Sequence, residues 1–173
     1  MQPEGLIAIG RLTKPHGLRG ELVFLPYIYD LELLPDLMQR HVFLQHRHAP
    51  VRTHTITEWR VLHKRVLIRL QGCQDLATAE AFREYEVLIP RSWFPSLPTG
   101  EYYWFEIEGL AVYSNDGRYL GTVVEIIYTG SNDVYVVRNG THETLIPALR
   151  DVVHTIDLEQ GEIHLFTTAG LLD

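Results

Sequence analysis

Short β-branched runs alternate with tight turn signals through residues 111–147, and this alternation limits what the chain can fold into. Turns of the Asn-Gly and Asn-Asp-Gly type have the backbone twist that joins neighbouring antiparallel strands. The two turns are Asn115-Asp116-Gly117, between AVY and YLGTVVEII, and Asn139-Gly140, between VYVV and ETLIP. The sequence therefore predicts a compact antiparallel β unit in the second half of the chain.

Four consecutive aromatic residues, Tyr102 to Phe105, precede these hairpins. We expect them to be extended, so that successive side chains point to opposite faces. Tyr102 and Trp104 then share one face. Tyr103 and Phe105 share the other. One pair can fill the core of a small barrel, and the second pair must be covered by the rest of the chain or by another molecule, because exposed aromatic patches usually mark contacts.

The first half of the chain begins with two predicted strands, residues 6–13 and 21–27, joined by the loop KPHGLRG at 14–20. Its proline and two glycines allow a tight turn of defined shape. The polar groups of this loop are Lys14, His16 and Arg19. Two readings stay open: the cations contact phosphate, or the loop is a structural connection with solvated charges.

Four more short segments of the first half have strand composition, and the run after Asp75 has helical spacing with that residue as N-cap. A helical turn is also expected at 30–37. The four strand segments are 42–44, 53–61, 66–70 and 87–90. Six short strands with one helix suggest a small closed barrel, because closure removes exposed strand edges.

A proline-rich stretch around residue 95 divides the chain and its charge. We predict an N-terminal domain at 1–92, a linker at 93–100 and a C-terminal domain at 101–173. Residues 1–95 hold 12 Lys and Arg against 10 Asp and Glu, a net charge of +2, whereas residues 96–173 hold 3 against 12, a net charge of −9. The second half therefore suits a basic protein partner, unless its charge serves only solubility. The predicted fold class is all-β, with two small β-barrels and one or two short helices.

Several functional classes find no support in the residues. The histidines at 41, 46, 48, 54 and 63 come from different predicted strands and loops, and no carboxylate or cysteine completes a metal-ligand spacing. No Ser/His/Asp or Cys/His arrangement of catalytic residues can be recognised, so no enzyme, cofactor or metal is predicted. The single cysteine, Cys73, fits a reducing compartment, and no apolar stretch is long enough to span a membrane. We expect a cytoplasmic, soluble and monomeric protein.

Motifs in both halves, taken in order, resemble one family. IGRLTKPHGLRGE (9–21) is similar to the opening signature of the bacterial RimM ribosome maturation factors. Four later motifs resemble the PRC-barrel half of the same family: EYYWFEIEG at 101–109, TGSNDVYVV at 129–137, LIP at 145–147 and IDLEQGEI at 156–163.

The resemblance implies a fold, a function and partners. It implies an N-terminal six-stranded barrel like those of translation factors, a C-terminal PRC barrel, and work in the late assembly of the small (30S) ribosomal subunit without catalysis. Family members bind small-subunit ribosomal protein nineteen in the subunit head and assist 16S rRNA processing. Tyr102 and Tyr103 match the paired tyrosines of that binding site, and Trp104 adjoins them. Lys14, His16 and Arg19 are the residues expected near rRNA.

Two rival functions remain. The first is a general nucleic-acid-binding barrel, in which Trp59, Arg60, Lys64 and Arg65 stack on bases and contact phosphate. The second is a split-barrel enzyme that holds a flavin against the aromatic residues.

Overall fold

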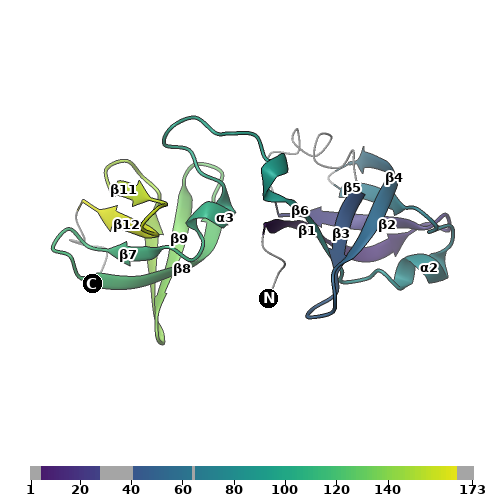
Figure 1. Ribbon diagram of the computed structural model, residues 1–173, viewed down its shortest axis with the longest axis horizontal. Coiled ribbons are helices and arrows are strands. Elements are labelled where there is room, and N and C mark those ends of the chain that lie inside the picture. The colour runs from purple at the N-terminus through teal and green to yellow at the C-terminus, as the bar shows by residue number, and fades with distance from the viewer. Residues whose placement is uncertain (1–4, 28–40, 64, 167–173) are drawn as a thin grey trace. The chain divides into compact units, whose positions relative to one another are not determined.

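Each half of the chain forms a six-stranded β-sheet, and the helices between the strands are short (Figure 1). The computed structural model describes residues 5–27, 41–63 and 65–166, and the chain divides into two units, Met1–Ser96 and Leu97–Asp173. The all-β prediction is confirmed. The helical turn expected at 30–37 lies outside the described residues, and the linker limits 93–100 stay a prediction.

The first unit is a closed barrel with the strand order β1-β2-β5-β4-β3-β6, in which β1 also pairs with β6. The predicted six-stranded barrel is thus confirmed, and so is the helix after Asp75, whose carboxylate accepts a hydrogen bond from the Thr78 N–H at 2.7 Å. The elements are β1 Leu6–His16, β2 Glu21–Pro26, β3 His41–Gln45, β4 Arg52–Leu62, β5 Arg65–Leu70, α2 Leu76–Glu80, β6 Glu86–Pro90 and the 3₁₀ helix η2 Arg91–Trp93.

Apolar side chains from the strands fill the barrel. Phe24 is the largest of the fully buried ones, and its ring lies against the backbone of Gly10. A Cβ atom at Gly10 would be 2.4 Å from the Phe24 ring, so only glycine fits there. The other large buried side chains are Ile9, Leu12, Leu22, Leu44, Leu67, Ile68, Leu70 and Leu88.

The connection between β1 and β2 is shorter than the sequence predicted. Strand β1 continues to His16 with an irregularity between Leu12 and Lys14, so the turn covers only residues 17–20. Its last residue, Gly20, has φ 76°, and a Cβ there would lie 2.4 Å from the Cys73 carbonyl oxygen. The turn is therefore held against the connection that follows β5.

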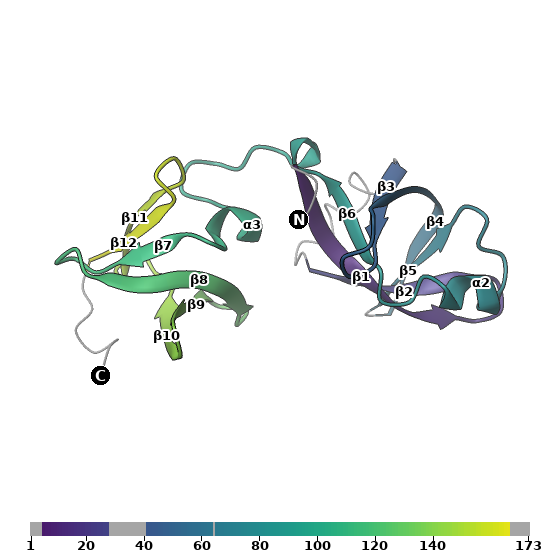
Figure 2. The same ribbon diagram turned by 60° about the horizontal axis from the view of Figure 1, so that its bottom comes forward.

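The second unit has the strand order β10-β9-β8-β7-β12-β11, which can be followed in Figure 2. Strand β7 pairs with β12 in parallel, and the other neighbouring strands are antiparallel. The two hairpins predicted from their turns, β7–β8 and β9–β10, are confirmed. The elements are α3 Trp104–Ile107, β7 Ala111–Tyr113, β8 Tyr119–Tyr128, β9 Asp133–Asn139, β10 His142–Pro147, β11 Val153–Asp157 and β12 Glu162–Leu165.

One core lies within the second unit. It is formed by Ile107, Leu110, Val112, Leu120, Val123, Tyr135, Val137, Ile146, Ile163 and Leu165. Partly buried side chains, Tyr102 among them, pack against it. Tyr102, the first of the four aromatic residues, therefore anchors this segment by packing against the core of the sheet.

Candidate functional site

The aromatic run is a loop followed by a helical turn, and the prediction of an extended strand is wrong. Helix α3 begins at Trp104, with Tyr103 as its N-cap. The Tyr103 N–H donates to the Glu106 carboxylate at 3.1 Å, while the Glu106 N–H donates to the Tyr103 carbonyl at 3.0 Å. A Glu three residues after the cap satisfies a backbone donor that a helix start leaves open, and this local signal outweighs the strand preference of aromatic residues.

The helical turn gathers three of the four rings. Tyr103 and Phe105 stack with ring centroids 5.2 Å apart, and Trp104 meets Phe105 edge-on at 5.1 Å. Trp104 also approaches Tyr103 edge-on at 6.4 Å. Tyr102 instead packs against the core of its unit. The predicted pairing of Tyr102 with Trp104 on one strand face is therefore wrong, and the two tyrosines have different surroundings.

Tyr102 forms part of the wall of a cavity of about 300 Å³ within the second unit. Aliphatic side chains and two tyrosines line the cavity together with the polar residues Arg150 and His154. Its lining residues are Gly100, Tyr102, Tyr135, Ala148, Leu149, Arg150, Val153, His154 and Ile156. Among these only Tyr102 belongs to the site predicted from the sequence, because the others converge through the folding of separate strands.

Tyr135 is the most buried polar group of this cavity. Its side chain is 8% exposed, and burial raises the pKa of its phenol to about 12, with smaller contributions from Asp133 and Tyr102. The phenol is therefore neutral at physiological pH. A cavity that combines tyrosine and aliphatic walls with Arg150 and His154 is suited to a partner side chain that has both apolar and polar parts.

The structure places Lys14, His16 and Arg19 on one hairpin of the first unit. Lys14 and His16 are at the end of β1, and Arg19 is in the turn. Lys14 and Arg19 are exposed, whereas His16 is half-buried and lies directly opposite Glu21 of β2. These residues and Tyr102 to Trp104 belong to different units.

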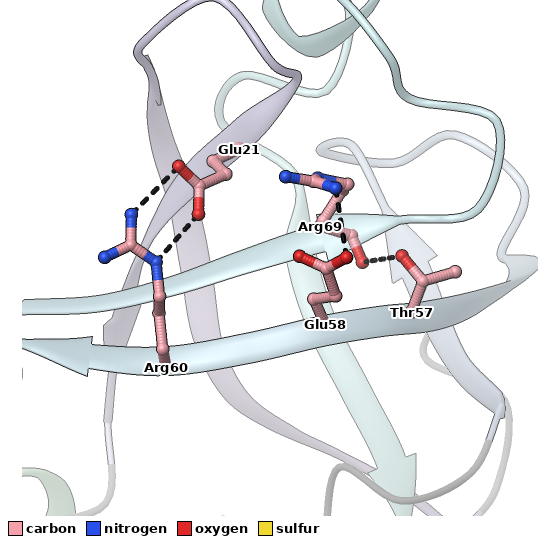
Figure 3. Close-up of polar contacts among 5 residues, drawn as sticks. All are labelled: Glu21, Thr57, Glu58, Arg60 and Arg69. Carbon is pink, nitrogen blue, oxygen red and sulfur yellow. Dashed lines mark hydrogen bonds and ion pairs between the residues drawn. The ribbon is translucent and has the colours of Figure 1, made fainter.

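Glu21, the strand partner of His16, belongs to a group of polar contacts on β2, β4 and β5. Figure 3 shows these contacts. The Nε and Nη2 atoms of Arg60 donate to the two Glu21 oxygens at 2.9 and 3.0 Å. Arg69 donates to Glu58 at 3.1 Å, and the Thr57 hydroxyl donates to the Arg69 carbonyl at 3.2 Å. The hydrogen bonds from Arg60 lower the pKa of the Glu21 carboxyl.

Two N–H groups of the Arg60 guanidinium are already engaged in hydrogen bonds to Glu21. A phosphate would have to displace the two-pronged contact with Glu21, which has the geometry of the strong carboxylate–guanidinium pairs. Of the other residues in the nucleic-acid reading, Trp59 is half-buried, Arg65 is exposed at the start of β5, and Lys64 lies outside the described residues. Arg60 and Glu21 are 39 positions apart, so no local pattern could have paired them.

In residues 5–27, 41–63 and 65–166, no three His, Cys, Asp or Glu side chains gather as a metal ion would need. No helix in this part of the chain has the length and apolar character to cross a membrane.

Comparisons with known proteins match both halves of the chain. Residues 7–94 match the RimM N-terminal domain, and residues 104–171 match the RimM PRC barrel domain. The chain is 37% identical over 168 residues to the ribosome maturation factor RimM of Geobacter metallireducens, covering 97% of this chain and 96% of that protein. It is 37% identical over 158 residues to the RimM of Thermotoga neapolitana, covering 91% and 89%. A crystal structure of RimM from Pseudomonas aeruginosa is 33% identical, with a TM-score of 0.48 and coverage of 92% and 96%.

Proposed function

The chain belongs to the RimM family of ribosome maturation factors, and from this premise we propose that it assists 16S rRNA processing and folding of the head of the small ribosomal subunit. The observation that carries the proposal is that both family domains match in order and together span nearly the whole chain. The family is not enzymatic, so the function is exerted through binding.

The proposed protein partner is small-subunit ribosomal protein nineteen, bound by the second unit. The net charge of −9 over residues 96–173 supports a basic partner, because opposite potentials speed and orient association. The contact residues in this proposal are Tyr102, Tyr103 and Trp104. Tyr102 contributes as a cavity wall, whereas Tyr103 and Trp104 contribute through the ring group at the start of α3.

The proposed RNA contact lies on the first unit, at Lys14, His16 and Arg19. The exposure of Lys14 and Arg19 supports it, since neither forms an ion pair with another described residue and both cations can reach a phosphate. Arg60 and Arg69 attract phosphate less strongly, because their charges are already neutralised by Glu21 and Glu58.

Binding of the purified full-length protein to purified protein nineteen tests the proposal. We expect Tyr103→Ala to weaken the affinity by about tenfold or more, as truncation of an aromatic contact residue commonly does. Tyr119→Ala is the matched control, because Tyr119 is a tyrosine of the same unit, 44% exposed on β8. Circular dichroism of both variants shows whether they remain folded.

The same proteins are then sedimented with precursors of the small subunit. Parent protein that neither binds protein nineteen nor sediments with these precursors would contradict the proposal. Equal affinities of the parent and Tyr103→Ala proteins would exclude Tyr103 from the contact. The affinity should also fall as salt is added, because the attraction between acidic and basic surfaces is screened.

A further inference from the structure

One end of the first unit's barrel collects three connections. All neighbouring strands are antiparallel, so β1, β3 and β5 end where β2, β4 and β6 begin. The turn 17–20, the turn 46–51 and the connection 71–85 therefore lie at the same end, which we call the loop end. Lys14, His16 and Arg19 belong to it, whereas Arg65 starts β5 at the opposite end.

Four rings meet at the loop end, and we call His46, His54, Phe82 and Tyr85 the ring cluster. His46 stacks on Tyr85 with centroids 5.0 Å apart and an angle of 28° between the rings. Phe82 meets Tyr85 edge-on at 5.7 Å and His54 edge-on at 5.1 Å. All four residues are half-buried rather than enclosed in the core, so the cluster forms part of the surface.

Two arginines and a histidine adjoin members of the ring cluster along the chain: Arg47 and His48 follow His46, and Arg52 is two residues before His54. Arg47, His48 and Arg52 are exposed, and within the described residues neither Arg47 nor Arg52 forms an ion pair. Arg47 follows His46 directly and has φ 53°, a left-handed conformation that is uncommon outside glycine. The residue next to the stacked His46 thus carries a guanidinium that forms no ion pair within the described residues.

The acidic groups of the loop end are largely engaged. Glu84 pairs with Arg11 at 3.2 Å, and Glu80 pairs with Arg83 at 3.2 Å. Glu86 accepts a hydrogen bond from the Tyr27 hydroxyl at 3.4 Å. The positive charge of Arg47 and Arg52 is therefore not cancelled by a direct carboxylate contact, as it is for Arg60 at Glu21.

We propose that the ring cluster binds an unpaired stretch of RNA, with a base stacked on His46 and phosphates held by Arg47 and Arg52. The inference rests on the proposed function, in which the first unit approaches rRNA, and it adds a second RNA contact at the loop end that carries Lys14, His16 and Arg19. Flat rings with flanking cations fit unpaired bases, because every base has a π-face and every nucleotide carries a phosphate. A duplex hides its bases in the stack, and an acidic peptide would use the cations but not the rings.

The full-length protein is titrated into a fluorescein-labelled single-stranded RNA decamer, and binding is read by fluorescence anisotropy at several salt concentrations. A duplex of the same sequence is measured in parallel. We expect the single strand to bind more tightly than the duplex, and His46→Ala to weaken its binding about tenfold. His46→Tyr retains a stacking ring and should bind like the parent protein.

Arg47→Gly removes the cation at a position where glycine suits the backbone, so folding is preserved. We expect weaker binding, and a slope of log affinity against log salt that is shallower by about 0.7 for one lost phosphate contact. Arg65→Gln is the matched control, because it removes an exposed cation from the opposite end of the barrel. It should bind as the parent does.

Three outcomes would overturn the inference: duplex bound as tightly as single strand, unchanged binding by both His46→Ala and Arg47→Gly, or a loss confined to Arg65→Gln. Sedimentation of the parent protein with small-subunit precursors shows whether the RNA-binding surface alone is wrong or the proposed function as well. If the parent sediments with precursors while the loop-end variants bind RNA normally, the function stands and this surface is wrong.

Discussion

Replacing Tyr135 with Phe should make the protein more resistant to alkaline unfolding. Tyr135 is 8% exposed in the core of the second unit, and burial raises the pKa of its phenol to about 12. In the unfolded chain a tyrosine titrates near 10. Two pKa units correspond to about 3 kcal/mol of preference for the neutral phenol in the folded protein.

The sign follows from which state holds the proton more tightly. The folded state does, so the stabilisation is fully present below pH 10 and is lost as the pH rises to about 12. Phe cannot ionise, so the variant lacks this loss. Between pH 9 and pH 12, the parent protein should therefore lose about 2–3 kcal/mol more unfolding free energy than the Tyr135→Phe protein.

Urea unfolding followed by circular dichroism at each pH measures this difference. Tyr119→Phe is the control, because Tyr119 is 44% exposed and should leave the pH profile of the parent unchanged. Absorbance of tyrosinate at high pH gives a direct reading, as the parent should titrate one more late tyrosine than the Tyr135→Phe protein. Parallel stability profiles for the parent and Tyr135→Phe would refute the argument that burial holds this phenol neutral.

Two further predictions concern the barrel of the first unit. Gly10→Ala should lower the unfolding free energy by about 1–3 kcal/mol in urea titrations, because the new methyl group meets the buried Phe24 ring; Gly17→Asn, at φ 66° with open space around it, should be nearly neutral, and equal effects would contradict the packing argument. Arg60→Gln should make the protein lose less stability in acid. The lowered pKa of the Glu21 carboxyl stabilises the folded state at pH values above 4.5, the usual pKa of this group, and that stabilisation is lost as the pH falls below 4.5 and Glu21 is protonated. Identical acid profiles for the parent and Arg60→Gln proteins would show that the ion pair has no such role.

Part of the fold could be predicted because its signals are local. The Asn139-Gly140 turn and the Asp75 cap depend on residues a few positions away, and both appear as expected. The prediction that the aromatic run is an extended strand was wrong, and the reason is again a local signal. Its residues favour strands on average, but Glu106 satisfies the backbone of Tyr103 and starts a helical turn.

By itself the sequence determined the all-β class, the closed barrel of the first unit and the positions of the main turns, since period-two alternation and turn chemistry act over a few residues. Only the tertiary structure decided which distant side chains meet. Arg60 reaches Glu21, His46 stacks on Tyr85, and Tyr102 joins the core while Tyr103 does not. Strand register and barrel closure set these contacts, and both result from packing between segments far apart in the chain.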